Sequence, residues 1–313
     1  MDLCISCSPF TRFPNLRTCS QHARQFNALS LLPPFSGEGY TCPVNLQSDA
    51  LIRAAAFGIS LGLLTLLEFL RPKRPAERGN ILRWTSNVGN SFLNTFILRF
   101  LLPIVPALMA IHAAERGIGI CNIFSLPMTL EVVVSIMALD LVIYFQHRMF
   151  HRFGILWRFH RMHHTDRYLD ATTALRFHIV EIALSLFIKT GVIFLLGSSF
   201  TAVVLFEIIL NSAAMFNHAN LSLPRKLDRL LRFFLVTPDM HFVHHSRKPR
   251  EMNSNFGFSL SWWDLLFGTY TEEPQEGNPG MKPGLNGFDD PKFAVLPGML
   301  FIPFLQPLKK EFK

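Results

Sequence analysis

LIRAAAFGISLGLLTLLEFL, at residues 51–70, contains one arginine and one glutamate among otherwise apolar or small side chains. A helix needs about 20 predominantly apolar residues to cross the hydrocarbon core of a bilayer. The stretch therefore predicts a membrane-spanning helix. It is followed by RPKRPAERGNILR, residues 71–83, where five basic residues accompany one acidic residue.

The composition of the whole chain agrees with a membrane protein. Half of the 313 residues are hydrophobic, only 17% are charged, and the mean hydropathy is +0.28. An average soluble domain has about 25% charged residues. The net charge of +8 comes mainly from basic runs that flank apolar runs, which is typical of membrane topology. It does not indicate a nucleic-acid-binding face, and we expect no nucleic-acid partner.

Further apolar regions extend the prediction along the chain. They are Val88–Ala114, about Leu126–Phe145, and a hairpin whose two short arms occupy residues 179–197 and 201–216. Their lengths are compatible with spanning or partly spanning a bilayer. We therefore expect an all-α integral membrane bundle with four or five membrane-embedded helices.

The charges predict one orientation for these helices. Segments 71–83 and 147–176 are strongly basic, whereas 112–124 is nearly neutral, so we expect both basic segments on the cytoplasmic side. The histidine-rich segments would then form a cytoplasmic cap on a multi-pass protein of a bacterial inner membrane or of the endoplasmic reticulum. PRKLDRLLRFFLV, residues 224–236, alternates basic and apolar residues at helical spacing, which predicts an amphipathic helix in the membrane interface.

Three parts of the chain are expected. Residues 1–48 are polar and are interpreted as a disordered extension, residues 49–272 as the membrane domain, and residues 273–313 as a polar loop and C-terminal tail. Four residues of the extension have spacing that can hold zinc. They are Cys4, Cys7, Cys19 and His22.

Ten of the twelve histidines lie between residues 147 and 245. His147 and His151 are four residues apart, so on a helix they share one face. Two further groups both have the pattern H-x2-H-H, and they consist of His160, His163 and His164, and of His241, His244 and His245. Neutral imidazole is a good ligand for Fe, Zn, Cu and Ni. A histidine doublet also lets one helix reach two ions.

Eight imidazoles are too many for one ion, because a structural zinc takes four ligands and a catalytic zinc takes three and a water. The pattern therefore predicts two metal ions that share a site. Iron is the natural redox-active choice, and zinc remains an alternative.

Several motifs occur in order along the chain. They are D-x6-H-R-x2-H at 140–151, WRFHRMHH at 157–164, TPDMHFVHHS at 237–246 and NSNFGFSLSWWDLLFGTY at 253–270. Together they resemble the sterol desaturase and fatty acid hydroxylase superfamily, most nearly its bacterial sterol desaturase family members, over about residues 50–272. The resemblance implies a membrane-bound, non-haem di-iron enzyme that uses O2 to hydroxylate or desaturate a C–H bond of a sterol, fatty acyl chain or related lipid.

The resemblance also implies the site residues. The expected iron ligands are the eight clustered histidines and a ninth in FNHAN, namely His147, His151, His160, His163, His164, His218, His241, His244 and His245. Asp140, His178 and Asn217 are expected to orient ligands. For Asp140, a hydrogen bond to a ligand imidazole and an ion pair with a nearby arginine are both open.

Two kinds of residue lie beside these motifs without being expected ligands. Asp264 is expected to fix a local turn. The tryptophans Trp157, Trp262 and Trp263 are expected to anchor the protein in the membrane interface, and a position at the substrate entrance is the alternative.

The chain contains no convincing GxGxxG fingerprint, cysteine set for an iron–sulfur cluster or CxxCH haem motif. We therefore expect electrons from a separate reductase or electron-carrier protein. Two other classes of function remain open. One is a metal transporter or metal-storing membrane protein, with histidines along a path through the bilayer. The other is a structural protein held together by zinc.

Overall fold

The computed structural model describes residues 46–75, 81–101 and 106–306. The expectations for residues 1–45, including the zinc spacing of Cys4, Cys7, Cys19 and His22, lie outside these ranges. Within them, all regular elements are α-helices or short 3-10 helices, and extended pairing is limited to isolated bridges. The all-α prediction is confirmed for the described part of the chain.

Five stretches are long and apolar enough to cross a membrane. The first corresponds to α1 (Leu46–Leu70), and the second contains α2 (Ile81–Leu101), α3 (Pro106–Glu115) and α4 (Ile120–Ile123). The other three are α5 (Met128–Arg152), α7 (Ile179–Leu196) and α8 (Phe200–His218). This confirms the prediction of a multi-pass bundle.

The outward faces of these helices are apolar. On α2, Phe92, Phe96 and Phe100 lie one turn apart and expose 72%, 72% and 80% of their surface. Soluble proteins rarely expose so large a contiguous apolar patch. Acyl chains are therefore the natural surroundings of this face.

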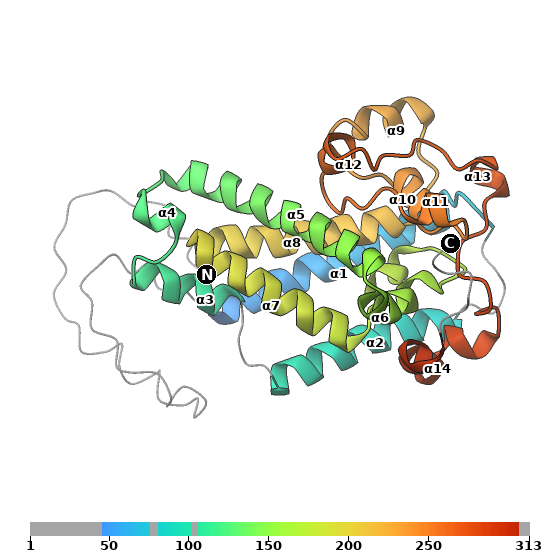
Figure 1. The fold of residues 1–313 in the computed structure, drawn as a ribbon, viewed down its shortest axis with the longest axis horizontal. Helices are drawn as coiled ribbons and strands as arrows, with labels where there is room; N and C mark the ends of the chain where they lie inside the picture. Colours follow the sequence, from blue (N-terminus) through green and yellow to red (C-terminus); the bar gives the residue numbers. More distant parts are fainter. Residues whose placement is uncertain (1–45, 76–80, 102–105, 307–313) are drawn as a thin grey trace. The chain divides into compact units, whose positions relative to one another are not determined.

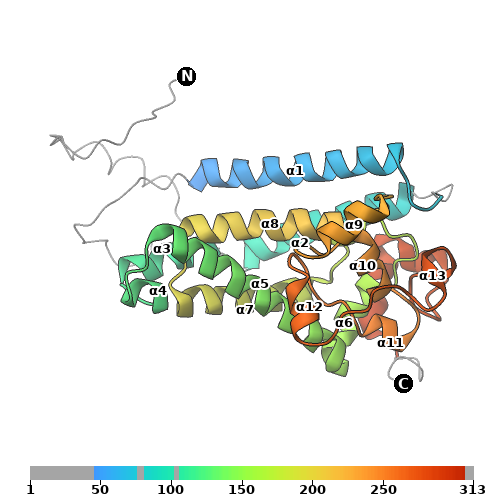
Figure 2. The same ribbon diagram turned by 90° about the horizontal axis from the view of Figure 1, so that it is seen from above.

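Small side chains let the bundle helices approach one another closely. Ala107 and Ala110 of α3 are fully buried against Leu139 of α5, and Val203 and Phe206 of α8 complete this core. On its other side α8 packs against α1, and the two helices run side by side (Figure 2). α8 is therefore the central helix that links α1 to α5.

The remaining elements gather where α5 and α8 end and α7 begins (Figure 1). We call this part the cap. Its elements are α6 (Gly154–His164), η2 (Ala171–Leu175), α9 (Arg225–Leu231), α10 (Pro238–His244), α11 (Pro249–Met252), α12 (Trp262–Leu266), α13 (Gly277–Gly280), η3 (Pro291–Ala294), α14 (Leu296–Phe301) and η4 (Ile302–Phe304).

The segment after residue 272 is part of the cap and packs against α6. From sequence it is expected to be a polar loop and tail, but Met299 and Ile302 are fully buried in one apolar cluster with Trp157 and Met162 of α6. The apolar run near the C-terminus is too short to span a bilayer. It is long enough to cover one face of α6.

One part of the expected basic loop belongs to a helix. α2 begins at Ile81, so Arg83 lies in its first turn and is buried. The Arg83 guanidinium donates to Asp166 at 2.7 Å and also pairs with Asp170. Because buried cations require counter-charges, Arg83 connects α2 to the chain after α6 and is not a free loop charge.

α9 exposes apolar side chains beside basic ones. Leu227 and Leu230 are exposed, and Arg225 and Arg229 are exposed on the same short helix. The position of this helix in the membrane interface stays a prediction.

Candidate metal centre

Two helices in a row supply five of the expected ligands. His147 and His151 are buried and lie one turn apart near the end of α5. Phe153 alone separates α5 from α6, and its N–H still donates to the Met149 carbonyl. The chain then turns into α6, whose last turns carry His160, His163 and His164, all buried.

α8 and α10 supply the other four. His218 is the last residue of α8 and is buried. α10 begins at Pro238, and the Thr237 hydroxyl accepts a hydrogen bond from the Met240 N–H as its N-cap. Proline at the first helical position and threonine before it both favour a helix start. This short helix carries His241 and His244, and His245 follows it.

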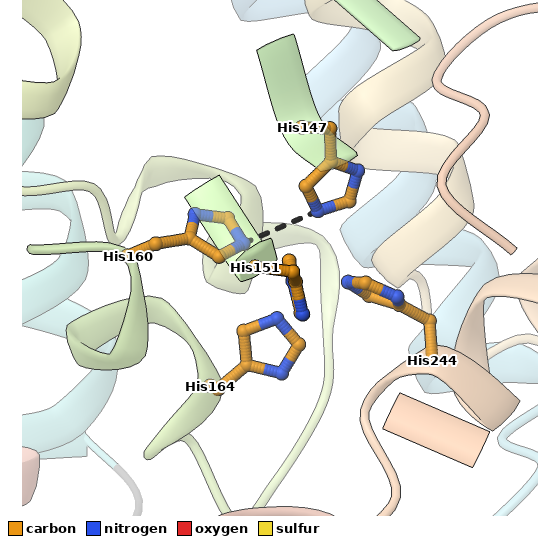
Figure 3. Close-up of side chains that lie close together, drawn as sticks. All are labelled: His147, His151, His160, His164 and His244. Carbon is orange, nitrogen blue, oxygen red and sulfur yellow. Dashed lines mark hydrogen bonds between the residues drawn. The ribbon is translucent and has the colours of Figure 1, made fainter. Parts of the chain in front are cut away.

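The nine histidines form two groups, and within each group one ring nitrogen per residue lies within 4.8 Å of every other. The five-histidine group contains His147, His151, His160, His164 and His244 (Figure 3). The four-histidine group contains His163, His218, His241 and His245. Each H-x2-H-H motif is therefore divided between the two groups.

The ring nitrogens have the separations of ligands around an ion. In the five-histidine group, the Nε2 atoms of His147 and His160 are 3.2 Å apart. In the four-histidine group, the Nε2 atom of His218 lies 3.0 Å from that of His163 and 3.1 Å from that of His241. Because a metal–nitrogen bond is about 2.0–2.1 Å, two ligand nitrogens on one ion lie roughly 3–4 Å apart.

The two groups are neighbours. The rings of His164 and His245, one from each group, are 4.5 Å apart between centroids, and those of His241 and His244 are 5.0 Å apart. The nine rings thus belong to one pocket.

Backbone carbonyls hold the outer nitrogens of several rings. The Nδ1 atoms of His147 and His244 lie 2.8 and 2.7 Å from the carbonyl oxygens of Phe256 and Ser254, respectively. A carbonyl only accepts, so Nδ1 carries the proton and donates. The lone pair is then on Nε2, and ligating histidines usually have such an orienting partner.

Glu181, a residue not expected from sequence as part of the site, orients a third ring of the five-histidine group. Its Oε1 atom lies 2.7 Å from Nδ1 of His160, and both side chains are buried. Carboxylate–histidine–metal arrangements of this kind are common. The available signal was the presence of an acid in an apolar helix, since such residues are functional by default.

Other nitrogens have no partner among the described residues. Both ring nitrogens of His151 and of His164 are buried without a hydrogen bond, as is Nε2 of His244. Buried polar atoms are normally satisfied. Metal ligation would satisfy the nitrogens that face the centre of each group.

The electrostatics favour neutral rings. Burial, reinforced by neighbouring imidazoles, holds the pKa of His163 and His164 well below its usual value, and the same causes lower the pKa of His241, His244 and His245. These rings are therefore neutral at pH 7. Coordination requires neutral imidazole, so the residues present fit an all-nitrogen iron site.

Asp140 is bonded differently from either expectation. Its carboxylate accepts from the backbone N–H groups of Ser259 and Leu260 and, at 2.8 Å, from the Trp263 indole. The sequence predicted either a ligand imidazole or an arginine as the partner of Asp140. The structure instead shows donors from the turn that follows Phe256. Three donors compensate the buried carboxylate, and Asp140 acts on the histidines only through this turn.

His178 and Asn217 also have structural partners. The Nδ1 atom of His178 accepts from the Val180 N–H at the start of α7, and burial lowers the pKa of His178 to about 4. Asn217 donates to the Phe258 carbonyl at 2.5 Å. His178 is therefore a helix cap outside both histidine groups, and Asn217 fixes the 254–260 segment to α8.

Asp264 fixes the same segment, as expected. It accepts from the N–H groups of Phe256 and Gly257 at 2.8 and 2.7 Å. A Cβ at Gly257 would lie 2.8 Å from the Asp264 carboxylate and 2.8 Å from the Leu260 carbonyl. Glycine is therefore required by this close approach.

The tryptophans differ from one another. Trp157 is 1% exposed, and its ring lies 4.9 Å from that of His151, so the interface-anchor expectation is wrong for it. Trp263 is buried against Asp140. Trp262 is 39% exposed, and its anchoring role stays a prediction.

Two cavities reach the five-histidine group. The first, which we call the α5 cavity, measures about 560 Å³ and is lined by His151 and Trp157. The second, the bundle cavity, measures about 280 Å³, lies among the membrane helices and is lined by His147, His160 and Glu181. A bound molecule can therefore approach this group from two sides.

Comparison with known proteins identifies the region of the chain that contains both histidine groups. Residues 132–269 match the fatty acid hydroxylase family. The chain is 29% identical over 149 residues to ornithine lipid hydroxylase OlsE of Rhizobium tropici, covering 48% of this chain and 44% of that protein. It is 31% identical over 159 residues to alkylglycerol monooxygenase of Xenopus tropicalis, covering 50% and 34%.

A third relative is fatty acid hydroxylase vlmA of Lecanicillium sp, with 33% identity over 156 residues, 45% of this chain and 41% of that protein. The aligned region thus spans less than half the length of each of these relatives. No solved structure matches the chain.

Proposed function

From the match of residues 132–269 to the fatty acid hydroxylase family, we propose that the protein is a membrane-bound, non-haem di-iron lipid hydroxylase. In the overall reaction, one lipid C–H bond becomes C–OH with an oxygen atom from O2. The second oxygen atom leaves as water after uptake of two electrons and two protons.

The observation that carries the proposal is the pair of adjacent histidine groups, whose ring nitrogens lie within 4.8 Å of one another in each group. When bound there, iron supplies the activation of O2 for attack on a C–H bond. An all-imidazole donor set suits iron. Because all the proposed ligands are histidines, none of them is a thiol that O2 would oxidise.

The protein's own residues hold and enclose the site. Glu181 and the carbonyls of Ser254 and Phe256 fix the orientation of three rings through their outer nitrogens. Burial of the histidines excludes bulk water, which prevents side reactions of activated oxygen.

A lipid substrate fits the surroundings. The bundle cavity is lined by Ile143, Phe150 and Leu186 next to His147, so an acyl chain can lie beside the five-histidine group. The relatives' names include an ornithine lipid hydroxylase, an alkylglycerol monooxygenase and a fatty acid hydroxylase. The proposed substrate class is therefore a membrane lipid with a long alkyl or acyl chain.

The cap lies on the cytoplasmic side in this proposal, because it contains the strongly basic segment 147–176 and adjoins the basic segment 71–83. A separate reductase or electron-carrier protein supplies the electrons there. Metal transport has no comparable support, since the nine grouped histidines lie at the ends of α5 and α8, in α6 and at α10 and do not follow a path along the membrane helices.

Comparative lipidomics tests the function. Cells that produce the protein should accumulate an O2-dependent hydroxylated lipid, and cells that produce His244→Ala should not. His112→Ala is the matched control, because His112 lies in α3 and outside both histidine groups. A structural zinc protein would give identical lipids in all three strains, and that result would overturn the proposal.

A further inference from the structure

The α5 cavity combines an apolar wall with two positive charges. Phe145, Met149 and Phe153 line it together with Arg148 and Arg152. The same cavity contains His151 of the five-histidine group. Its lining is therefore amphipathic, as a lipid with a charged headgroup is.

The two arginines lie one helical turn apart, at the end of the candidate span of α5. Arg148 and Arg152 are four residues apart, so they share a face of α5, and Arg152 ends both the helix and its candidate span. The end of a span is the level of lipid headgroups. Met149 and Phe153, 38% and 54% exposed, make the neighbouring surface compatible with acyl chains.

No carboxylate of the described residues forms an ion pair with either arginine. The buried Asp264 carboxylate, which interacts electrostatically with Arg148, accepts from two backbone N–H groups and from the Thr269 hydroxyl. Arg148 lies 5.7 Å from the Tyr144 ring centre, and among the described residues no carboxylate forms an ion pair with Arg152. Among the described residues, neither guanidinium is neutralised by an ion pair, and the polar partner of Arg148 is the Tyr144 hydroxyl.

Resting on the proposed function, we propose that Arg148 and Arg152 bind the anionic headgroup of the lipid substrate in the α5 cavity. Phosphate and carboxylate share the required chemistry, because either can accept charge-assisted hydrogen bonds from guanidinium. Since His151 is one helical turn from Arg148, the headgroup is held close to the five-histidine group. The arginines are specificity residues and do not contact the reacting bond.

Native mass spectrometry of the purified full-length protein tests this. The protein is mixed with equal amounts of dioleoyl phosphatidic acid, dioleoyl phosphatidylcholine and oleate. The wild type should retain phosphatidic acid or oleate about tenfold more than phosphatidylcholine. The preferred anion then identifies the headgroup as phosphate or carboxylate.

Arg148→Gln/Arg152→Gln should lose this preference and keep its binding of phosphatidylcholine. Arg250→Gln is the control, because Arg250 is exposed on α11 and does not line the cavity. If the double variant does not fold, Arg152→Gln alone should weaken the preference, since Arg152 is exposed at the helix end. Equal retention of all lipids by the wild type, or an unchanged preference in the variants, would overturn the inference.

The binding measurement needs neither iron nor O2, so it separates the two proposals. Anionic-lipid selectivity without any oxidation product would remove the hydroxylase function alone. Oxidation of lipids without any charge selectivity would remove the headgroup site alone.

Discussion

The five-histidine group and the four-histidine group use the same side chain in different surroundings. Three members of the former, His147, His151 and His160, line the α5 cavity or the bundle cavity. None of the four-histidine group lines either cavity. His163 instead stacks on Phe177, with 4.3 Å between ring centroids.

The orienting contacts differ in the same way. In the five-histidine group, a carboxylate and two carbonyls hold the outer nitrogens of three rings. In the four-histidine group, only His218 is held, by the Ala214 carbonyl, and Nδ1 of His163, His241 and His245 has no partner in the described part of the chain. Under the proposed function, we therefore expect substrate to meet the five-histidine group, with the four-histidine group enclosed behind it.

The largest effect is expected from loss of one histidine in either group. His151→Ala and His163→Ala should each lower lipid hydroxylation about a thousandfold, because metal contributes several kcal/mol to such chemistry and 1.36 kcal/mol is a factor of ten. Product formation with membranes as the lipid source is the measurement. Only His151→Ala should also alter lipid retention. A His163→Ala protein with more than a tenth of normal turnover would show that the enclosed group is dispensable.

Loss of the carboxylate behind His160 should have a smaller effect that is specific to the five-histidine group. Glu181→Gln is expected to lower iron affinity and turnover 10- to 100-fold, the usual range for a partner of a ligand. Glu131→Gln is the matched control, since Glu131 is a buried acid of α5 that accepts hydrogen bonds from the Ser135 hydroxyl and the Ser199 N–H and lies outside both histidine groups. Equal iron retention by both variants would contradict the positioning role of Glu181.

The smallest effect is expected at Asp140. Asp140→Asn should lower stability by about 1–3 kcal/mol, because three donors lose part of their acceptor. This corresponds to a Tm roughly 2–4 °C lower per kcal/mol for a domain of about 150–250 residues. Since Asp140 holds the turn that follows Phe256, the change should reach the five-histidine group through His147. Thermal unfolding in detergent measures it, and an unchanged Tm would show that the turn does not depend on this carboxylate.

Local sequence was sufficient for the spans and for the convergence of the histidines. An apolar run of span length and a set of histidines at helical spacing each lie within a single helix. Both patterns can therefore be recognised in the sequence alone. The division of each H-x2-H-H motif between two groups was not readable, because it depends on how α5, α8 and α10 pack around α6. For the same reason, Glu181 was missed: its partner His160 is on another helix.

The interaction partners of single charged residues also depend on tertiary packing and could not be predicted from sequence. Asp140 and Arg83 look alike in sequence, as charges near apolar runs, but one accepts from a turn and the other pairs with Asp166. The packing of Met299 and Ile302 onto α6 likewise depends on a surface that only the folded cap creates.

The metal content of the purified protein tests the central claim most directly. The protein is reconstituted anaerobically with ferrous iron, and excess metal is removed. Inductively coupled plasma mass spectrometry should then find two iron atoms per chain in the wild type. His151→Ala and His163→Ala should each retain about one. One iron atom or fewer per wild-type chain, or preferential binding of zinc from a mixture of both metals, would contradict a di-iron centre.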